Sequence, residues 1–197
     1  MYVKFWKRFF DITIASVAMI VLSPVFLVAA VCIKLDSKGP VLFFQKRVGI
    51  NKKHFMIIKF RTMSSDTPAD IPTHQLSGAG NCITRVGAVL RKTSIDELPQ
   101  LWNIIVGDMS LIGPRPALYN QYDLIRERDK YRANAVRPGL TGWAQVNGRD
   151  ELPIPVKAKY DGEYTAKISL VIDMRCFLKT IVNVFSGTGI SDGSGRV

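Results

Sequence analysis

The feature that most constrains this chain is an uncharged stretch close to its N-terminus. Residues 12–33 are 22 consecutive positions without Asp, Glu, Lys or Arg. A helix of this length reaches across the hydrocarbon core of a bilayer, which is about 30 Å thick. The stretch is long for a buried helix and longer than the apolar region of a secretory signal, and Val31 stands where a cleavage site requires a small residue. The sequence therefore predicts a membrane segment.

Ser23 and Pro24 divide this segment near its middle. Pro24 has no N–H to donate to the carbonyl of Ile20, so a helix is expected to bend or break there. Each half is then about 16 Å long, which is enough for one leaflet. Two structures fit the pattern: a kinked helix that crosses the membrane, and a helix–break–helix hairpin that enters and leaves on the same side.

Basic residues lie on both sides of the segment. A crossing helix would place one of the two clusters outside, against the general preference for cytoplasmic Lys and Arg, whereas a re-entrant hairpin keeps both clusters in the cytoplasm. The residues are Lys4, Lys7 and Arg8 before the segment, and Lys34, Lys38, Lys46 and Arg47 after it. Taken alone, these patterns leave both topologies open.

A β-hairpin is predicted directly after the membrane segment. The stretches 41–44 and 54–63 are rich in β-forming residues, and they flank a basic turn that contains Gly49 and Asn51. Ser, Asp, Pro, Thr and Gly dominate residues 64–81, which favours a mobile surface loop.

Three helices are predicted in the rest of the chain. Apolar residues recur at helical spacing over 98–106 and stop at Gly107, a typical residue after a helix end, so we expect a short buried helix. A polar helix is expected over 119–135. Residues 170–185 form an apolar pattern interrupted by charges, which suits a helix lying along a membrane surface.

The charge balance limits the partners. The chain has 27 Lys and Arg against 16 Asp and Glu, a formal charge of +11, which favours nucleic acid, anionic lipid or phosphorylated substrates. We expect no nucleic-acid partner, because no helix-turn-helix, RNP-like or zinc pattern is found. Cys32, Cys82, Cys176, His54 and His74 are not spaced as metal ligands, so we interpret them as ordinary structural or polar residues.

The pair Asp96 and Glu97 is a candidate for chemistry, with two interpretations. The first is helix capping, because Ser94 and Glu97 fit the S-x-x-E capping box before the helix at 98–106, and this is the commoner meaning of such a pattern. The second is catalysis, in which the pair supplies a nucleophile and a metal ligand while Arg91 and the helix N-terminus bind phosphate.

Arg115 is a candidate phosphate ligand because of its neighbours. Pro114 and Pro116 restrict the backbone on both sides, so the guanidinium is held at low entropic cost. Such a group suits two-pronged contact with phosphate, although a surface turn is an alternative. The stretch 136–149 also combines arginines with Pro and Gly corners, and an ordinary structured loop is an alternative there too.

Four blocks of this sequence resemble a known family. They are KFRTM at 59–63, TSIDELPQLWN at 93–103, GDMSLIGPRP at 107–116 and RPGLTGWAQVNGR at 137–149. Together they are similar to the signature blocks of the monotopic phosphoglycosyl transferases, the bacterial sugar transferase family. The resemblance runs from the membrane segment to Asp173 and leads us to expect a small single-domain member.

The resemblance implies an enzyme that transfers a sugar-1-phosphate from a UDP-sugar to polyprenyl (undecaprenyl) phosphate, releases UMP and initiates glycoconjugate assembly. The implied route has two steps and a covalent intermediate on Asp96, with Mg²⁺ held by Asp96 and Glu97. Arg91 and Arg115 would bind phosphate. Further candidates for the same basic site are Lys59, Arg61, Arg137 and Arg149. One departure from the pattern is Cys82, where relatives often carry a basic residue.

The resemblance also implies the fold and the place of the protein. We expect an α+β protein with a re-entrant membrane anchor over 1–36, broken at Ser23 and Pro24. A mostly helical catalytic region over 37–197, with a small β-hairpin, would lie on the cytoplasmic face of the bacterial inner membrane. No pattern indicates which sugar is carried or an oligomeric state.

A different class of protein also fits part of the sequence. A basic, membrane-tethered binding or scaffold protein without catalytic activity explains the charge and the anchor. It does not explain an acidic pair beside arginines that are fixed by proline.

Overall fold

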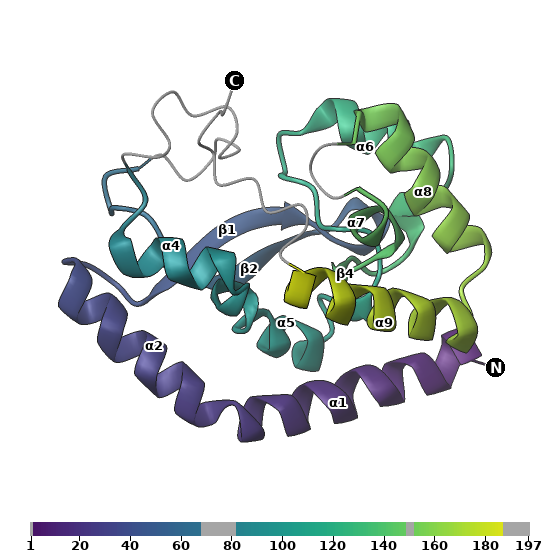
Figure 1. Ribbon diagram of the computed structural model, residues 1–197. Helices are drawn as coiled ribbons and strands as arrows, with labels where there is room; N and C mark the ends of the chain where they lie inside the picture. The colour runs from purple at the N-terminus through teal and green to yellow at the C-terminus, as the bar shows by residue number, and fades with distance from the viewer. Residues whose placement is uncertain (1, 68–81, 149–151, 187–197) are drawn as a thin grey trace.

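The computed structural model describes residues 2–67, 82–148 and 152–186. The chain begins with a short π-helix, η1 (Tyr2–Trp6), followed by α1 (Lys7–Val21) and α2 (Ser23–Asp36). Within the described ranges no single helix is long and apolar enough to cross a membrane, but α1 and α2 together meet that test, with a bend of 60° between them. Figure 1 shows the two helices as a wide V along one side of the molecule.

The bend has the cause that the sequence predicts. Leu22 leaves the helical conformation at φ −88° and ψ 4°, and α2 starts with Ser23 and Pro24. Pro24 has no N–H, so it cannot continue the hydrogen bonds of α1. The N–H of Leu22 still bonds the carbonyl of Ala18 at 2.9 Å, and the N–H of Phe26 bonds Leu22 at 3.0 Å. The break is therefore confined to about one residue.

The predicted β-hairpin is confirmed. Strand β1 (Leu42–Val48) pairs antiparallel with β2 (His54–Phe60), from Leu42 opposite Phe60 to Val48 opposite His54. The turn between them, η2 (Ile50–Lys52), contains Asn51 with φ 52°. The first strand is longer than predicted and the second shorter, because residues 61–63 leave the sheet. Most of the predicted loop over 64–81 lies outside the described residues.

Short helices and a second, two-stranded parallel sheet make up the rest. The elements are α4 (Arg85–Lys92), η4 (Ile95–Glu97), α5 (Gln100–Val106), β3 (Ser110–Ile112), α6 (Tyr122–Asp129), η5 (Ala133–Ala135), β4 (Gly139–Thr141), α7 (Trp143–Val146), α8 (Ile154–Ala166) and α9 (Leu170–Ser186). Strands β3 and β4 run parallel. These elements confirm the predicted α+β fold with a broken N-terminal helix pair.

Two predicted helices need correction. Helix α5 ends at Gly107, with φ 104°, as predicted, but it is buried on one face only: Leu101 and Ile104 are covered, whereas Trp102 is 52% exposed. The polar helix expected over 119–135 is divided into α6 and η5, because Arg132 adopts a left-handed conformation at φ 56°.

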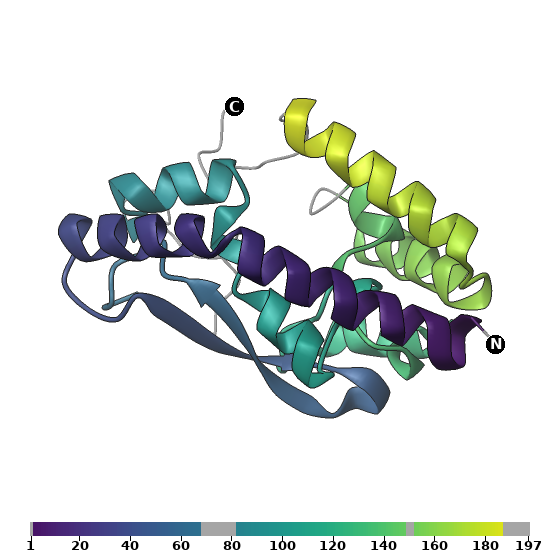
Figure 2. The same ribbon diagram turned by 90° about the horizontal axis from the view of Figure 1, so that it is seen from below.

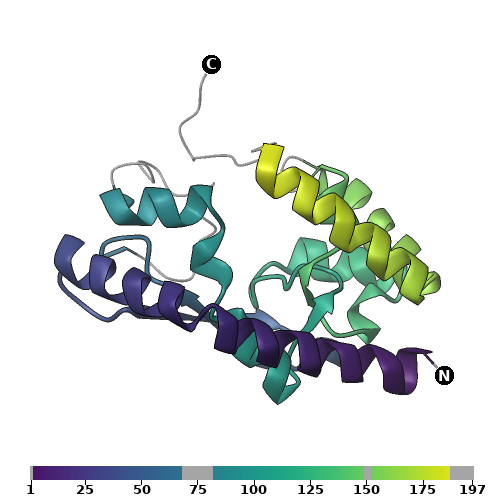
Figure 3. The same ribbon diagram turned by 60° about the horizontal axis from the view of Figure 1, so that its bottom comes forward.

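Helices α1 and α2 share a core with the rest of the protein. Ala15 of α1 packs with Ile57 of β2 and with Leu101 and Ile104 of α5. A second cluster joins Ala29 and Ile33 of α2 to Phe60 and Leu90. Seen from the side on which α1 and α2 lie, these two helices cross the whole molecule, with α4 beside α2 and α9 on the side of α1 (Figures 2 and 3).

The outer face of α1 and α2 is apolar, and no described part of the chain covers it. Large apolar side chains of α1 and α2 that are more than one-third exposed are Phe9, Phe10, Ile12, Ile14, Val17, Ile20, Val21, Leu27, Val28, Val31 and Leu35. Water does not favour so large a continuous apolar surface, which is typical of contact with lipid or with another protein.

Candidate active site

The acidic pair lies on the 3₁₀ turn η4, between α4 and α5. Ser94 precedes this turn in a left-handed conformation with φ 57°, and its side chain makes no capping hydrogen bond. The side chain of Glu97 turns instead toward Lys59 and Arg115. The capping-box interpretation of Ser94 and Glu97 is therefore wrong.

Glu97 accepts hydrogen bonds from two cations. Lys59 Nζ lies 2.7 Å from Glu97 Oε1, and the two terminal nitrogens of Arg115 lie 2.6 Å from Oε1 and 3.3 Å from Oε2. The Glu97 side chain is 19% exposed, the Lys59 side chain 16% and that of Arg115 35%. Pairs that are partly shielded from water interact more strongly than pairs on an open surface.

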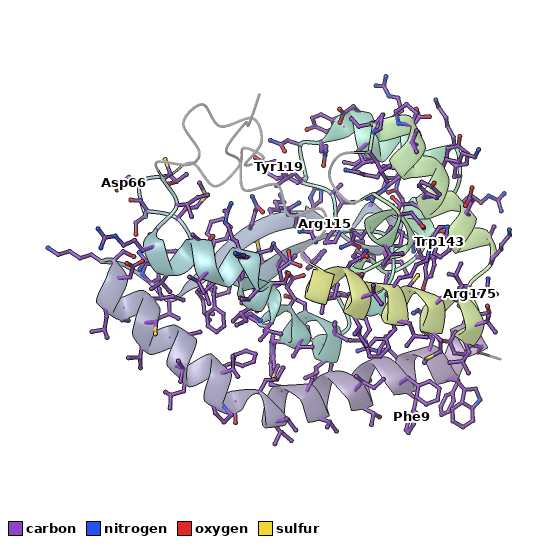
Figure 4. The ribbon with its side chains drawn as sticks, in the orientation of Figure 1. Phe9, Asp66, Arg115, Tyr119, Trp143 and Arg175 are labelled. Atoms are coloured by element: carbon purple, nitrogen blue, oxygen red, sulfur yellow. The ribbon has the colours of Figure 1, made fainter. Side chains whose placement is uncertain are left out.

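The backbone around Arg115 is held from two directions. The N–H of Gly139 donates to the carbonyl of Pro114 at 2.9 Å, and Arg47 Nη1 donates to the carbonyl of Pro116 at 3.0 Å. Strand β3 leads directly into this segment. In Figure 4, Arg115 lies near the centre of the molecule, between the β1–β2 hairpin and the part that carries α7 and α9.

Asn103 fixes α5 against the strand that carries Lys59. Its Oδ1 accepts the N–H of Ile58 at 3.0 Å, and its Nδ2 donates to the carbonyl of Met56 at 2.8 Å. Asn103 is only 2% exposed. The acidic pair on η4, just before α5, is thereby positioned relative to Lys59. Sequence reasoning missed Asn103, although a polar residue on the buried face of a helix is a usable signal.

Asp96 differs from Glu97 in its surroundings. It is 9% exposed, and within the described part of the chain no group donates a hydrogen bond to its carboxylate. Burial, aided by the charge of Glu97 and opposed by Lys59, Arg91 and Arg115, raises the pKa of Asp96 to about 6.

The pKa of Glu97 moves in the opposite direction. Burial alone would raise it, but Arg115 and Lys59 together hold the pKa of Glu97 well below its usual range. At neutral pH, Glu97 is therefore a fixed anion paired with cations. Asp96 is also ionised there, and it is the more basic of the two carboxylates. Neighbouring groups whose pKa values are pushed apart are typical of catalytic sites.

Arg91 reaches the site from the end of α4. Its Nε donates to Thr62 Oγ1 at 2.8 Å, and its charge contributes to lowering the pKa of Asp96. Helix α4 lies close to the Thr62 backbone at Gly87. This approach is possible because Gly87 has no side chain, and a Cβ there would collide with the carbonyl of Thr62. Lys59 of β2, Arg91 of α4 and Arg115 of the segment after β3 thus converge on the acidic pair.

Two of the other candidate cations lie elsewhere. Arg61 is 5% exposed and donates to the carbonyls of Ser37 and Lys38 and to Ser65 Oγ, so it links the end of α2 to the segment after β2. Arg137 Nε donates to the carbonyl of Gly107 at 2.9 Å, at the far end of α5 from the acidic pair.

Two further residues lie at the edge of the described ranges or outside them. Arg149 lies outside the described residues. Cys82 is half-buried, and its carbonyl accepts the N–H of Ser64 at 2.8 Å.

The acidic pair offers oxygen ligands for Mg²⁺. Among the described residues, no group of three or more His, Cys, Asp or Glu side chains is placed to hold a metal ion. Mg²⁺ is, however, commonly held by one or two carboxylates together with phosphate oxygens of the substrate. The Asp96 carboxylate is available for this purpose. Glu97 can bind the ion only if it exchanges its contact with Lys59 or Arg115 for one with Mg²⁺. The donor set therefore fits Mg²⁺ bound jointly with a phosphorylated substrate.

These features define a class of protein: an α+β protein with a lipid-compatible broken helix pair, and a site in which two carboxylates face three cations. The chain belongs to the bacterial sugar transferase family, whose sequence model matches residues 2–187. This confirms the resemblance of the four sequence blocks.

Individual relatives are similar over most of this chain. A UDP-N-acetylgalactosamine-undecaprenyl-phosphate N-acetylgalactosaminephosphotransferase of Aeromonas hydrophila is 42% identical over 94% of this chain and 45% of its own length. An undecaprenyl-phosphate glucose phosphotransferase of Komagataeibacter xylinus is 40% identical over 89% of this chain and 35% of its own length. The exopolysaccharide production protein PSS of Rhizobium leguminosarum bv. phaseoli is 41% identical over 90% of this chain and 94% of its own length. The chain thus spans less than half of the first two relatives.

Proposed function

We propose that the protein transfers a sugar-1-phosphate from a UDP-sugar to undecaprenyl phosphate and releases UMP. The relatives from Aeromonas and Komagataeibacter are named for transfer to this lipid. The observation that carries the proposal is the state of Asp96: a buried carboxylate with a raised pKa and no hydrogen-bond donor among the described residues, beside Lys59, Arg91 and Arg115. A carboxylate in this state is suited to act as a nucleophile in a site for anionic substrates.

The first step is attack of an Asp96 carboxylate oxygen on the phosphorus that carries the sugar. A bond forms between this oxygen and phosphorus, and the bond from phosphorus to the bridging oxygen of the diphosphate breaks. That oxygen leaves with its electron pair as part of UMP, and the sugar-phosphate remains on Asp96 as an acyl phosphate. No proton has to move, because Asp96 is ionised at neutral pH.

The second step returns the carboxylate. An oxygen of undecaprenyl phosphate attacks the same phosphorus, and the bond between phosphorus and Asp96 breaks. The product is a lipid-linked sugar diphosphate. Arg91 and Arg115 would hold the phosphate oxygens in both steps, while Lys59 and Arg115 keep Glu97 in place. Mg²⁺ bound at Asp96 and Glu97 would neutralise charge on the diphosphate.

The anchor fits a re-entrant arrangement at the cytoplasmic face of the membrane. The 60° bend and the exposed apolar side chains of α1 and α2 support insertion into one leaflet, and the basic residues on both flanks support a cytoplasmic position for both ends. In this arrangement the acidic pair would lie on the side where UDP-sugars are present, next to the lipid substrate.

Release of UMP tests the proposed activity. Purified protein in detergent, supplied with Mg²⁺, undecaprenyl phosphate and a panel of UDP-sugars, is expected to release UMP with at least one sugar. The matched Asp96→Asn variant is expected to release none. If no sugar of the panel supports release while the protein still binds lipid vesicles, the result would favour a non-catalytic tethering protein instead.

A further inference from the structure

Polar side chains on α1 hold α5 and β3, the two elements adjacent in sequence to the active-site groups. Arg8 Nη1 donates to the carbonyl of Ile104 at 2.6 Å, and Nη2 donates to the carbonyl of Ile105 at 2.9 Å. These carbonyls belong to the last turn of α5, whose first turn follows the acidic pair. A cation at a helix C-terminus satisfies carbonyls that have no partner within the helix.

Asp11, one helical turn after Arg8, holds strand β3. Its Oδ2 accepts the hydroxyl of Ser110 at 2.7 Å, and its Oδ1 accepts the N–H of Leu111 at 3.0 Å. Asp11 is 4% exposed and Ser110 is 1% exposed. A carboxylate so far from water is costly unless it is hydrogen-bonded, so this contact has a defined geometry.

The two edges of β3 have different partners. The N–H of Ser110 donates to Pro138 at 2.9 Å and the N–H of Gly113 donates to Thr141 at 2.8 Å, so these groups face β4. The N–H of Leu111 faces the opposite edge, where Asp11 accepts it. The anchor helix therefore takes the place of a neighbouring strand on that edge.

The position of β3 determines the position of Arg115. Only residues 113 and 114 separate the end of β3 from Arg115, and the prolines on both sides of Arg115 restrict its backbone. A shift of β3 is thus passed to the guanidinium rather than absorbed in the loop. Arg115 Nη2 lies 2.6 Å from Glu97 Oε1. Glu97 precedes the first turn of α5, and Arg8 binds the last turn of the same helix.

We propose that Asp11, supported by Arg8, is a positioning residue of the active site: it holds β3 so that Arg115 reaches Glu97 and the substrate phosphate. This inference rests on the proposed function, because it presumes the role of Arg115. Its consequence is that the anchor supplies part of the architecture of the site as well as the attachment to lipid. Neither Asp11 nor Arg8 was singled out as a site residue by the sequence motifs.

A double-mutant cycle tests this positioning role. Asp11→Ala is made in the unaltered protein and in the Arg115→Lys variant, and kcat/KM for the UDP-sugar is measured from UMP release. Asp11→Ala is expected to lower kcat/KM about tenfold in the unaltered protein but less than about twofold in the Arg115→Lys background. Asp11→Asn is expected to restore most of the activity, because its amide can accept from Leu111 and donate to Ser110.

Lys34→Gln is the matched control. It removes a hydrogen bond of the neighbouring helix α2, to the carbonyl of Gly39 at 2.9 Å, that does not involve β3. Any loss that it causes is expected to be the same factor in both backgrounds. If Asp11→Ala does not fold, as judged from its melting transition, Ser110→Ala replaces it in the cycle with the same expected non-additivity.

Two results would overturn the inference, and they are distinguishable. An equal loss from Asp11→Ala in both backgrounds would show that Asp11 contributes only general stability, and the proposed function would be unaffected. Nearly normal kcat/KM of Arg115→Lys on its own would contradict the proposed role of Arg115, and with it the positioning role of Asp11.

Discussion

Replacement of Arg115 by Lys keeps the charge and removes the planar fork, which allows a quantitative prediction. Arg115 contacts Glu97 through two nitrogens, at 2.6 and 3.3 Å, and Lys can offer only one nitrogen to one oxygen. We count one lost charge-assisted hydrogen bond to Glu97 and one to the phosphate that Arg115 is proposed to bind. Buried bonds of this kind are worth about 1.5 to 3 kcal/mol each.

Solvent reduces these values here. The side chain of Arg115 is 35% exposed, so we take about 1 kcal/mol for each bond. The sum of about 2 kcal/mol corresponds to a loss in kcat/KM of about thirtyfold. Stability is expected to change little, because a surface-accessible ion pair contributes at most about 1 kcal/mol to folding.

Steady-state UMP release and a thermal melt of the same samples provide the assay. Arg137→Lys is the matched control, because Arg137 also adjoins a proline but binds the carbonyl of Gly107 at the far end of α5, and it is expected to stay within about twofold of the unaltered protein. Turnover of Arg115→Lys within twofold, or a loss explained entirely by unfolding, would refute the reasoning.

Three further predictions follow from the acidic pair and the anchor. Because ionised Asp96 is the proposed nucleophile, kcat is expected to fall as pH drops through about 6, the raised pKa of this group, and a pH–rate profile with its acid limb near 4 would contradict this. Glu97→Gln is expected to impair turnover, with partial recovery in a Mg²⁺ titration if the defect lies in metal affinity; full activity at low Mg²⁺ would exclude a role for Glu97. A cysteine placed at residue 2 is expected to resist membrane-impermeant thiol reagents in intact cells, and replacing Ser23 and Pro24 with helix formers is expected to increase its labelling; labelling in the otherwise unaltered protein would refute the re-entrant topology.

The parts of the fold that follow from local rules were predictable from the sequence. The break at Pro24 follows from a missing N–H, the β-hairpin from β-forming stretches around a turn, and the end of α5 from Gly107. Each depends on neighbouring residues alone. The same holds for α9, whose apolar periodicity extends over its whole length.

The site was only partly predictable, because contacts between distant segments decide it. Arg115 and Arg137 both adjoin prolines in the sequence. Arg115, just after β3, contacts Glu97, whereas Arg137, just before β4, donates to the carbonyl of Gly107. Arg61 belongs to the same block as Lys59 but faces the end of α2. The capping box failed because the left-handed conformation of Ser94 is set by the turn between α4 and α5 and not by the S-x-x-E pattern.

The contacts of the anchor with the active site were not predicted, although the sequence contains a signal for one of them. Asp11 is the acidic residue that directly precedes the uncharged stretch, a position where a carboxylate needs a partner. Its partners Ser110 and Leu111 lie about 100 residues later, and only the folded chain shows them.

Intact-protein mass spectrometry after incubation with a UDP-sugar alone tests the central claim most directly. Without the carrier lipid, the second step cannot occur, so the account predicts an added mass of one sugar-phosphate, mapped by peptide analysis to Asp96 and lost when undecaprenyl phosphate is supplied. The Asp96→Asn variant is predicted to carry no adduct and to release no UMP. It is predicted to melt no lower than the unaltered protein at pH 7.5, because burial of the ionised carboxylate, which raises its pKa, disfavours the folded state above that pKa. An active Asp96→Asn enzyme, or an adduct mapped to another residue, would contradict the account.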